Sequence, residues 1–271
     1  MIRIINNINE HLKWLDEYLY DTSYSTPFCN EDRIISVSKK DNHILLGSYK
    51  DWKLTGIFCL MVSHEEKTME TIFMYSREST AYEELLEYLS ENYIGYEVWF
   101  VFNPKNDAVK NCLLNRDAFF YTEQRYMEYE GHNLPDTKEI IPYCKTYKDD
   151  YVKIHDSEGY WNGEKVLENI SDFDVFLCVR DNKLVGYIDL SKGIDLVEIM
   201  DIWILPEYRN QGIGTLLLRK AISFVGSKRL ILTVDVDNNP ANHLYEKIGF
   251  KEILSNNCMT ARYISANVKE K

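Results

Sequence analysis

The segment that most constrains this chain runs from Val197 to Ile222, VEIMDIWILPEYRNQGIGTLLLRKAI, and predicts a strand, a glycine-bearing turn and a helix in that order. Residues 198–205 are mostly apolar and end at Pro206, whose nitrogen cannot donate a ladder hydrogen bond, so a strand should stop there. From Gln211 onward a helix with one buried face is indicated by apolar residues at steps of three and four: Ile213, Leu216, Leu217, Ala221, Phe224 and Val225.

The turn itself reads Arg209-Asn210-Gln211-Gly212-Ile213-Gly214. Without a Cβ at either glycine, an incoming group can approach the backbone closely. The first turn of a helix has four unpaired N–H groups and a partial positive charge, and an arginine adds a full charge, so this turn offers a seat for phosphate oxygens. A short glycine pattern alone also fits an ordinary tight turn, and the rest of the chain has to decide between the two.

A second motif follows another predicted strand, residues 229–236, and reads Asn238-Asn239-Pro240-Ala241-Asn242-His243-Leu244-Tyr245-Glu246-Lys247-Ile248-Gly249-Phe250. With the glycine turn, in this order and about two dozen residues apart, it resembles the GNAT superfamily of N-acetyltransferases. The resemblance covers residues 134–271, about half the chain. It implies acetyl-CoA as co-substrate, direct attack of an amine on the thioester, and no metal.

Length and composition fit two globular domains. The chain has 271 residues, 45% hydrophobic and 13% aromatic, with no low-complexity segment. Its net charge of −12 argues against nucleic acid as a partner and favours a cationic substrate, although excess acid also simply keeps a protein in solution. The six cysteines are scattered singly, which suggests neither a zinc site nor a disulfide framework.

No basic segment followed by an apolar core marks a signal peptide, and no apolar run approaches membrane-spanning length. The sequence therefore predicts a cytoplasmic protein without a membrane partner. The oligomeric state stays open.

The first half has its own order of elements. It predicts a helix over 9–20, then strands and helices in the order strand 33–38, strand 43–49, strand 56–62, strand 70–75, helix 80–92, strand 97–103 and helix 107–115. Residues 111–119 align without a gap with residues 242–250, which we interpret as an internal repeat. The first copy is degenerate: Leu114 stands where Tyr245 stands, and Ser76 to Ala81 has no glycine.

Negative charge at Glu78, Glu83 and Glu84 should also repel a pyrophosphate from that helix start. We therefore expect an α/β (α+β) fold of two GNAT-like domains, each a mixed, mostly antiparallel sheet flanked by helices. The expected domains are 1–131, degenerate, and 135–271, which binds acetyl-CoA, with a linker over 131–135.

In the second half the sequence predicts a strand over 138–143, one or two helices within 147–170, and a hairpin of strands 173–180 and 184–190. After the helix that carries Tyr245, residues 250–254 and 258–264 are expected to close the same sheet as a second hairpin.

The resemblance implies which residues hold acetyl-CoA. Its pyrophosphate should lie on the backbone N–H groups of the turn, and its pantetheine arm along the strand. The implied residues are Arg209, Asn210, Gln211, Gly212, Ile213, Gly214 and Thr215 for the pyrophosphate, and Ile202, Trp203 and Ile204 for the arm. Asn238 is expected to contact the same arm, and is also a typical residue for a helix start beside a proline.

Two catalytic roles follow from the same resemblance. Tyr245 is expected to protonate the departing thiolate. Glu198 is the first choice as the base for the acceptor ammonium, since it lies on the strand of the cofactor arm. Asp201 competes with it, but stands an odd number of positions away and should face the other side of the sheet. Thr233 stands where some relatives have a base on the next strand, and ordered water is the remaining choice.

Three functions fit the sequence. The first is an N-acetyltransferase that acts on a primary amine of a small cationic molecule. The second is an acetyltransferase for a protein N-terminus or lysine. The third is an acyl-CoA sensor without catalysis, which the intact glycine turn and Tyr245 disfavour.

Overall fold

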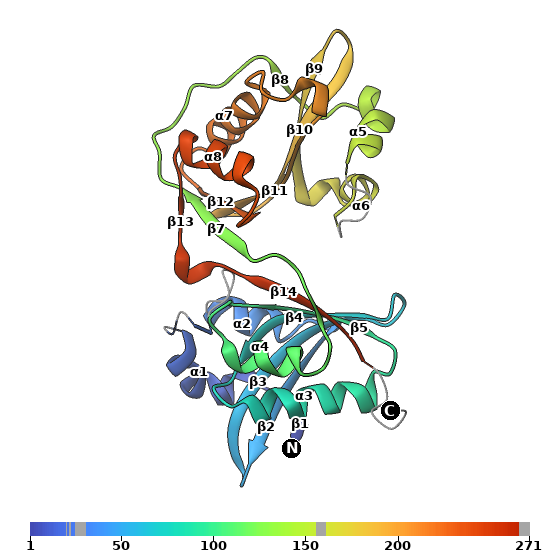
Figure 1. Cartoon of the computed structure of the whole chain (residues 1–271), viewed down its shortest axis with the longest axis vertical. Coiled ribbons are helices and arrows are strands. Elements are labelled where there is room, and N and C mark those ends of the chain that lie inside the picture. Colours follow the sequence, from blue (N-terminus) through green and yellow to red (C-terminus); the bar gives the residue numbers. More distant parts are fainter. Residues whose placement is uncertain (20, 22, 25–30, 156–160, 266–271) are drawn as a thin grey trace. The chain divides into compact units, whose positions relative to one another are not determined.

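The computed structural model describes residues 1–19, 21, 23–24, 31–155 and 161–265 (Figure 1). These fall into two compact units, Met1–Arg125 with Leu254–Lys271, and Tyr126–Ile253. No helix in the described ranges is long and apolar enough to cross a membrane.

The first unit is a seven-stranded sheet in the order β1-β2-β3-β4-β5-β14-β6. Buried side chains of α1 and α2 pack on one of its faces, and those of α3 and α4 pack on the other. Its elements are β1 (Ile2–Ile4), α1 (Leu12–Leu19), α2 (Glu31–Val37), β2 (His43–Lys50), β3 (Lys53–Ser63), β4 (Thr68–Tyr75), α3 (Ser79–Asn92), β5 (Glu97–Phe102), α4 (Asp107–Leu114), β6 (Phe119–Phe120) and β14 (Met259–Ile264).

The second unit repeats this plan with the strand order β13-β7-β12-β11-β10-β9-β8. Here α7 and α8 pack on one face, and α5 and α6 on the other. Its elements are β7 (Gln124–Tyr129), β8 (Ile140–Pro142), α5 (Lys148–Ile154), α6 (Gly163–Glu168), β9 (Phe173–Arg180), β10 (Lys183–Ser191), β11 (Leu196–Ile204), α7 (Ile213–Val225), β12 (Arg229–Asp235), α8 (Asn239–Ile248) and β13 (Phe250–Glu252).

Both sheets are mixed and mostly antiparallel, with parallel pairs at β4–β5 and β11–β12. The two strand orders match element for element when the second is read in reverse. The expected fold class, two similar mixed sheets flanked by helices, is therefore confirmed.

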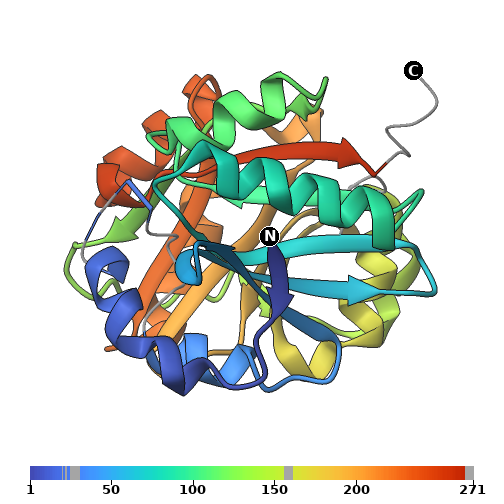
Figure 2. The same cartoon turned by 90° about the horizontal axis from the view of Figure 1, so that it is seen from below.

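The last strand of each half lies in the other half's sheet. The late strand β14 inserts between β5 and β6, where Ala261 lies opposite Phe100 and Phe120. The early strand β7 lies between β12 and β13. The colours show this exchange, since β14 is red among the blue and cyan strands of the first sheet (Figure 1, Figure 2).

The exchange contradicts one sequence prediction. Strands β13 and β14 do not form a hairpin, because β13 pairs with β7 and β14 pairs with β5 and β6. The compact units accordingly differ from the expected ranges 1–131 and 135–271. The second unit begins at Tyr126, and the first unit also includes the chain from Leu254 onward.

The strand expected over residues 33–38 is also wrong, since residues 31–37 form helix α2. Ile34 and Val37 are both buried in the core with α1. Their spacing of three places them on one helical face, so packing overrides the preference of β-branched residues for strands.

Candidate functional site

The turn after β11 has the backbone that its glycine predicts. Gly212 caps α7 in the left-handed region, with φ of 81°, and no atom lies within 4 Å of the position that a Cβ would take. A side chain here would be strained and would project into open space. Gly214 serves packing instead, because a Cβ there would lie 2.8 Å from Cδ2 of Leu244 on α8.

The turn presents a row of backbone donors. Within the described ranges, no hydrogen bond is donated by the N–H groups of residues 211–215, and the first N–H of α7 to find a backbone acceptor is that of Leu216, 3.1 Å from the oxygen of Gly212. These groups stand at the positive end of a 13-residue helix. Their geometry suits an anion such as a pyrophosphate.

Arg209 lies beside this row, and its side chain folds back onto the end of strand β11. Its Nε donates to the oxygen of Ile204 at 3.0 Å, and its guanidinium lies 4.7 Å from the ring centroid of Trp203. The strand end, the arginine and the donors thus meet at one place.

Strand β11 has an open edge over its last residues. Its parallel pairing with β12 runs from Leu196 opposite Arg229 to Ile199 opposite Leu232 and is absent beyond that in the described structure. The backbone of residues 202–204 on the β12 side is thereby available to a ligand that adds to the strand edge. Asn238 caps α8, where its side chain accepts from the N–H of Ala241 at 3.3 Å. That is the structural role considered for it from the sequence.

Tyr245 lies on α8, in the core between α7, α8 and the sheet, and only 6% of its surface is exposed. Its ring packs against Phe250 at 5.8 Å between centroids. No hydrogen bond to its hydroxyl occurs among the described residues. Burial, and then the negative charge of Asp201, raise the pKa of this phenol above its usual value of 10.0, so it stays protonated at neutral pH.

A bulge in β11 overturns the expected orientation of Asp201. Along β10, Asp189 pairs with Asp201 but the next residue, Leu190, pairs with Ile199, which leaves Met200 as the extra residue. The bulge shifts the two-residue alternation by one. Asp201 therefore lies on the same face as Glu198, the face opposite α7 and α8, and the two carboxylates do not exclude one another.

On that face lies a hydrogen-bonded group that the sequence did not predict, the acidic network of Tyr151, His155, Tyr187, Asp189 and Asp201. Asp189 Oδ2 accepts from the Tyr151 hydroxyl at 2.6 Å and lies 2.9 Å from His155 Nε2. The same Nε2 lies 3.7 Å from Asp201 Oδ2, which accepts from the Tyr187 hydroxyl at 2.5 Å. The rings of His155 and Tyr187 stack at 4.8 Å.

The network runs from the interior to the surface. The side chains of Asp189 and His155 are only 1% and 2% exposed, whereas that of Asp201 is 35% exposed. Burial raises the pKa of Asp189, and hydrogen bonds from His155 and Tyr151 oppose that rise. A charged residue in an otherwise apolar strand was the one sequence signal that could have identified Asp189.

The corresponding place in the first unit is closed. Strands β4 and β5 also pair only at their start, from Thr68 to Glu70. Beyond it the Thr71 hydroxyl accepts from the N–H of Val101 at 2.8 Å, so a side chain occupies the strand edge. At the start of α3 the N–H of Glu78 donates to the Ser76 hydroxyl at 3.0 Å. These backbone N–H groups of the first unit are therefore bonded to side chains of the protein and are not available to a ligand.

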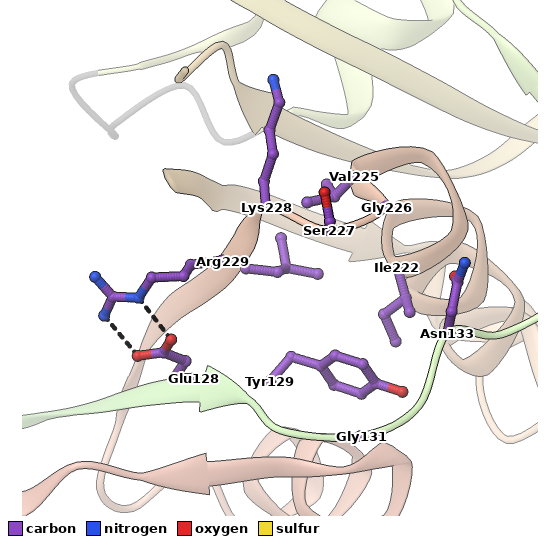
Figure 3. A pocket seen from close by; sticks show the side chains of 11 residues that line it. Glu128, Tyr129, Gly131, Asn133, Ile222, Val225, Gly226, Ser227, Lys228 and Arg229 are labelled. Atoms are coloured by element: carbon purple, nitrogen blue, oxygen red, sulfur yellow. Dashed lines mark hydrogen bonds and ion pairs between the residues drawn. The ribbon is translucent and has the colours of Figure 1, made fainter. Parts of the chain in front are cut away.

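A cavity of about 250 Å³ lies elsewhere, at the C-terminal end of α7, whereas the glycine turn is at its N-terminal end (Figure 3). Arg229 closes one side of it by a two-pronged contact to Glu128, at 2.7 and 2.6 Å. A larger cavity of about 830 Å³ lies along α5 and α6. Neither is the cofactor seat implied by the sequence. In the described ranges, no group of three or more His, Cys, Asp or Glu side chains could hold a metal ion.

Known proteins match the second half of the chain in sequence. The model of the acetyltransferase (GNAT) family matches residues 141–250. A ribosomal protein bS18-alanine N-acetyltransferase of Haemophilus influenzae is 36% identical over 77 residues, 28% of this chain and 53% of that one. A mycothiol acetyltransferase of Corynebacterium efficiens is 31% identical over 105 residues, 35% of this chain and 36% of that one. The chain thus spans about half the length or less of these relatives.

Solved structures match over the whole chain. A GCN5-related N-acetyltransferase from Sphaerobacter thermophilus superposes with a TM-score of 0.70 at 11% identity, over 98% of this chain and 96% of that one. A tandem GNAT protein from the clavulanic acid biosynthesis pathway gives 0.64 at 12% identity, over 98% and 99%. Residues 141–250 therefore match the GNAT family of acetyltransferases, and the chain has the fold of tandem GNAT structures, whose second unit contains this matched segment.

Proposed function

We propose that the second unit transfers the acetyl group of acetyl-CoA to a primary amine by direct attack of the amine on the thioester. The observation that carries the proposal is the row of N–H donors of residues 211–215, placed directly after the strand whose edge is open over residues 202–204. Phosphate and pantetheine need these two features side by side. When bound, acetyl-CoA supplies the thioester carbonyl on which the chemistry occurs.

In this proposal the donors of residues 211–215 bind the pyrophosphate, and Arg209 adds its charge. The edge of β11 at Ile202, Trp203 and Ile204 binds the pantetheine amides, with the Nδ2 group of Asn238 nearby, since its Oδ1 is used in the helix cap. Asn210, with φ of 59°, shapes the turn before Gly212.

Tyr245 acts as the acid that protonates the departing sulfur. Its pKa is raised by burial, its hydroxyl has no acceptor among the described residues, and the charge of Asp201 acts on it across the strand. A carboxylate on the other face of β11, Asp201 or Glu198, takes the proton of the acceptor ammonium. An acid and a base on opposite faces of one strand suit a reaction in which one group gains a proton as another loses one.

The acceptor we propose is the amine of a small cationic molecule. Two carboxylates of β11 and the buried Asp189 lie on one face of the sheet, so this face favours a positive charge. The second candidate is a protein N-terminus, because the Haemophilus relative is named as an N-acetyltransferase for an alanine of ribosomal protein bS18 and matches part of the same segment. An acyl-CoA sensor without turnover is the outcome if no acceptor reacts.

Thiol release from acetyl-CoA across polyamines, aminoglycosides, amino acids and peptides tests the proposal. Calorimetry on Gly212→Glu then tests the cofactor seat: the variant should lose CoA binding, because it adds strain and negative charge beside the donors. Gly226→Glu is the matched control. Gly226 ends the same helix with φ of 67° and no atom near a Cβ, so it carries a similar strain away from the seat. Normal CoA binding by Gly212→Glu would place the seat elsewhere.

A further inference from the structure

The acidic network joins three elements of the second unit. Strand β10 carries Tyr187 and Asp189, strand β11 carries Asp201, and helix α5 carries Tyr151 and His155. Each contact fixes the next group: Tyr151 holds Asp189, Asp189 holds His155, the His155 ring stacks on Tyr187, and the Tyr187 hydroxyl holds Asp201. Asp201 is thus the partly exposed end of this series of contacts, and Asp189 lies at its buried end.

Only one oxygen of Asp201 takes part in the acidic network. Its Oδ2 accepts from Tyr187 and faces His155 Nε2, and no hydrogen bond to Oδ1 occurs among the residues that the structure describes. With a side chain that is 35% exposed, Asp201 can present Oδ1 to an incoming group. A carboxylate that is oriented by one oxygen and open at the other suits a base for an ammonium.

We propose that Asp201 takes the proton of the acceptor ammonium and that His155 and Asp189 are positioning residues that orient Asp201 through Tyr187. The inference rests on the proposed acetyl transfer and names its base. It assigns to Glu198, on the same face, no part in the proton transfer.

The proposed reaction releases one net proton. The ammonium nitrogen loses one proton to the Asp201 carboxylate, and its lone pair then forms the C–N bond while the C–S bond breaks. The second proton of that nitrogen replaces the one that Tyr245 gives to the sulfur. Asp201 returns its proton to water through its exposed side. The products are the amide, the thiol and one proton.

The charged and titratable groups around Asp201 support this assignment. They are Tyr151 and His155 from α5, Tyr187 and Asp189 from β10, Tyr245 from α8, and Glu198 on β11 itself. The negative charge of Asp201 adds to burial in raising the pKa of Tyr187, so that hydroxyl stays a donor to the carboxylate. Asp201 is held as an acceptor by a group that does not titrate near neutral pH.

The pH profile of kcat/KM distinguishes the base from its support. With Asp201 present, the reacting species are the carboxylate and the ammonium, so the profile should be flat between the pKa of the base and that of the amine. Asp201→Asn has no base and uses only free amine, so kcat/KM should rise about tenfold per pH unit and should be about 10²–10⁴-fold below wild type at neutral pH.

Asp189→Asn should keep the flat profile, because Asp201 is still present, but should lower kcat about tenfold with unchanged CoA affinity. His155→Gln, which keeps a donor, should retain more activity than His155→Ala. Asp149→Asn, an exposed carboxylate on α5, controls for the substitution itself. Spermidine is the first probe, followed by the best acceptor of the panel. A flat profile in Asp201→Asn, or a sloped one in Glu198→Gln, would overturn the assignment.

A measurement without any acceptor tests the coupling separately. In protein labelled with ¹⁵N at its six histidines, Asp189→Asn and Asp201→Asn should each shift the His155 Nε2 resonance, and the other five should stay in place. An unchanged His155 in Asp201→Asn would refute the positioning chain even if acetyl transfer is found. If no amine releases thiol from wild type, the proposed function and the base role fail together, while this measurement still decides the coupling.

Discussion

Replacing Tyr245 by Phe isolates the hydroxyl from the rest of the side chain. The ring keeps its place in the core against Phe250, 5.8 Å away. Because the hydroxyl has no partner among the described residues, its removal leaves no buried donor or acceptor without a hydrogen bond. The free energy of unfolding should therefore change by less than about 1 kcal/mol.

Turnover should fall much further. A positioned general acid contributes on the order of 10²–10⁴-fold, which is about 2.7–5.4 kcal/mol in the activation barrier at 1.36 kcal/mol per factor of ten. CoA affinity should stay near wild type, since the proton is given only as the C–S bond breaks. The pKa of Tyr245 lies above 10.0, so wild type should keep its acid through pH 9.

The assay pairs thiol release with calorimetric CoA binding and thermal unfolding on the same preparation. Tyr143→Phe is the control, because Tyr143 is a half-buried tyrosine of the same unit outside the acidic network, and a phenylalanine keeps its ring contact with Tyr151 at 5.9 Å between centroids. Near-normal turnover in Tyr245→Phe would make Tyr245 a packing residue. Tyr245→Ala should then lower the melting temperature while Tyr245→Phe leaves it unchanged.

Three further outcomes are expected. Calorimetry should give one CoA per chain, because Thr71 occupies the strand edge of the first unit, and a value of two would refute this account. Burial raises the pKa of Asp189 above 3.8, so the folded state holds this proton more tightly, and the contribution of Asp189 to the free energy of unfolding should decline as pH rises above about 4. Urea unfolding should show that the stability of Asp189→Asn relative to wild type increases with pH over this range, while that of Asp149→Asn does not. Ala261→Glu should destabilise the first unit by about 3–5 kcal/mol in chemical denaturation, because it buries an unpaired charge, whereas Ile264→Glu at an exposed position should cost under about 1 kcal/mol.

The sequence predicted the strand, turn and helix around Gly212 because the signals there are local. A proline ends the strand, a glycine without a Cβ takes a positive φ, and apolar residues recur with the period of a helix. Alternation and turn residues likewise located most strands of both sheets.

The failures concern contacts that no local pattern encodes. The orientation of Asp201 depends on a bulge at Met200, and a one-residue shift reverses every side chain after it. His155 and Asp189 meet from positions 34 residues apart, so their pairing has no spacing to recognise. Strand β14 finds its partners about 160 residues earlier in the chain, and a hairpin with β13 was the simpler expectation.

The reciprocal placement of β7 and β14 also constrains when each sheet can be completed. Strand β6 has only two residues, and its pairing is with β14. At a synthesis rate of about 5–20 residues per second, the roughly 140 residues from Phe120 to Met259 take about 7–28 s to make. During that time one edge of β5 has no partner, and its backbone groups can pair with a strand of another molecule. The first sheet is thus closed only by a strand that is made about 140 residues after β6.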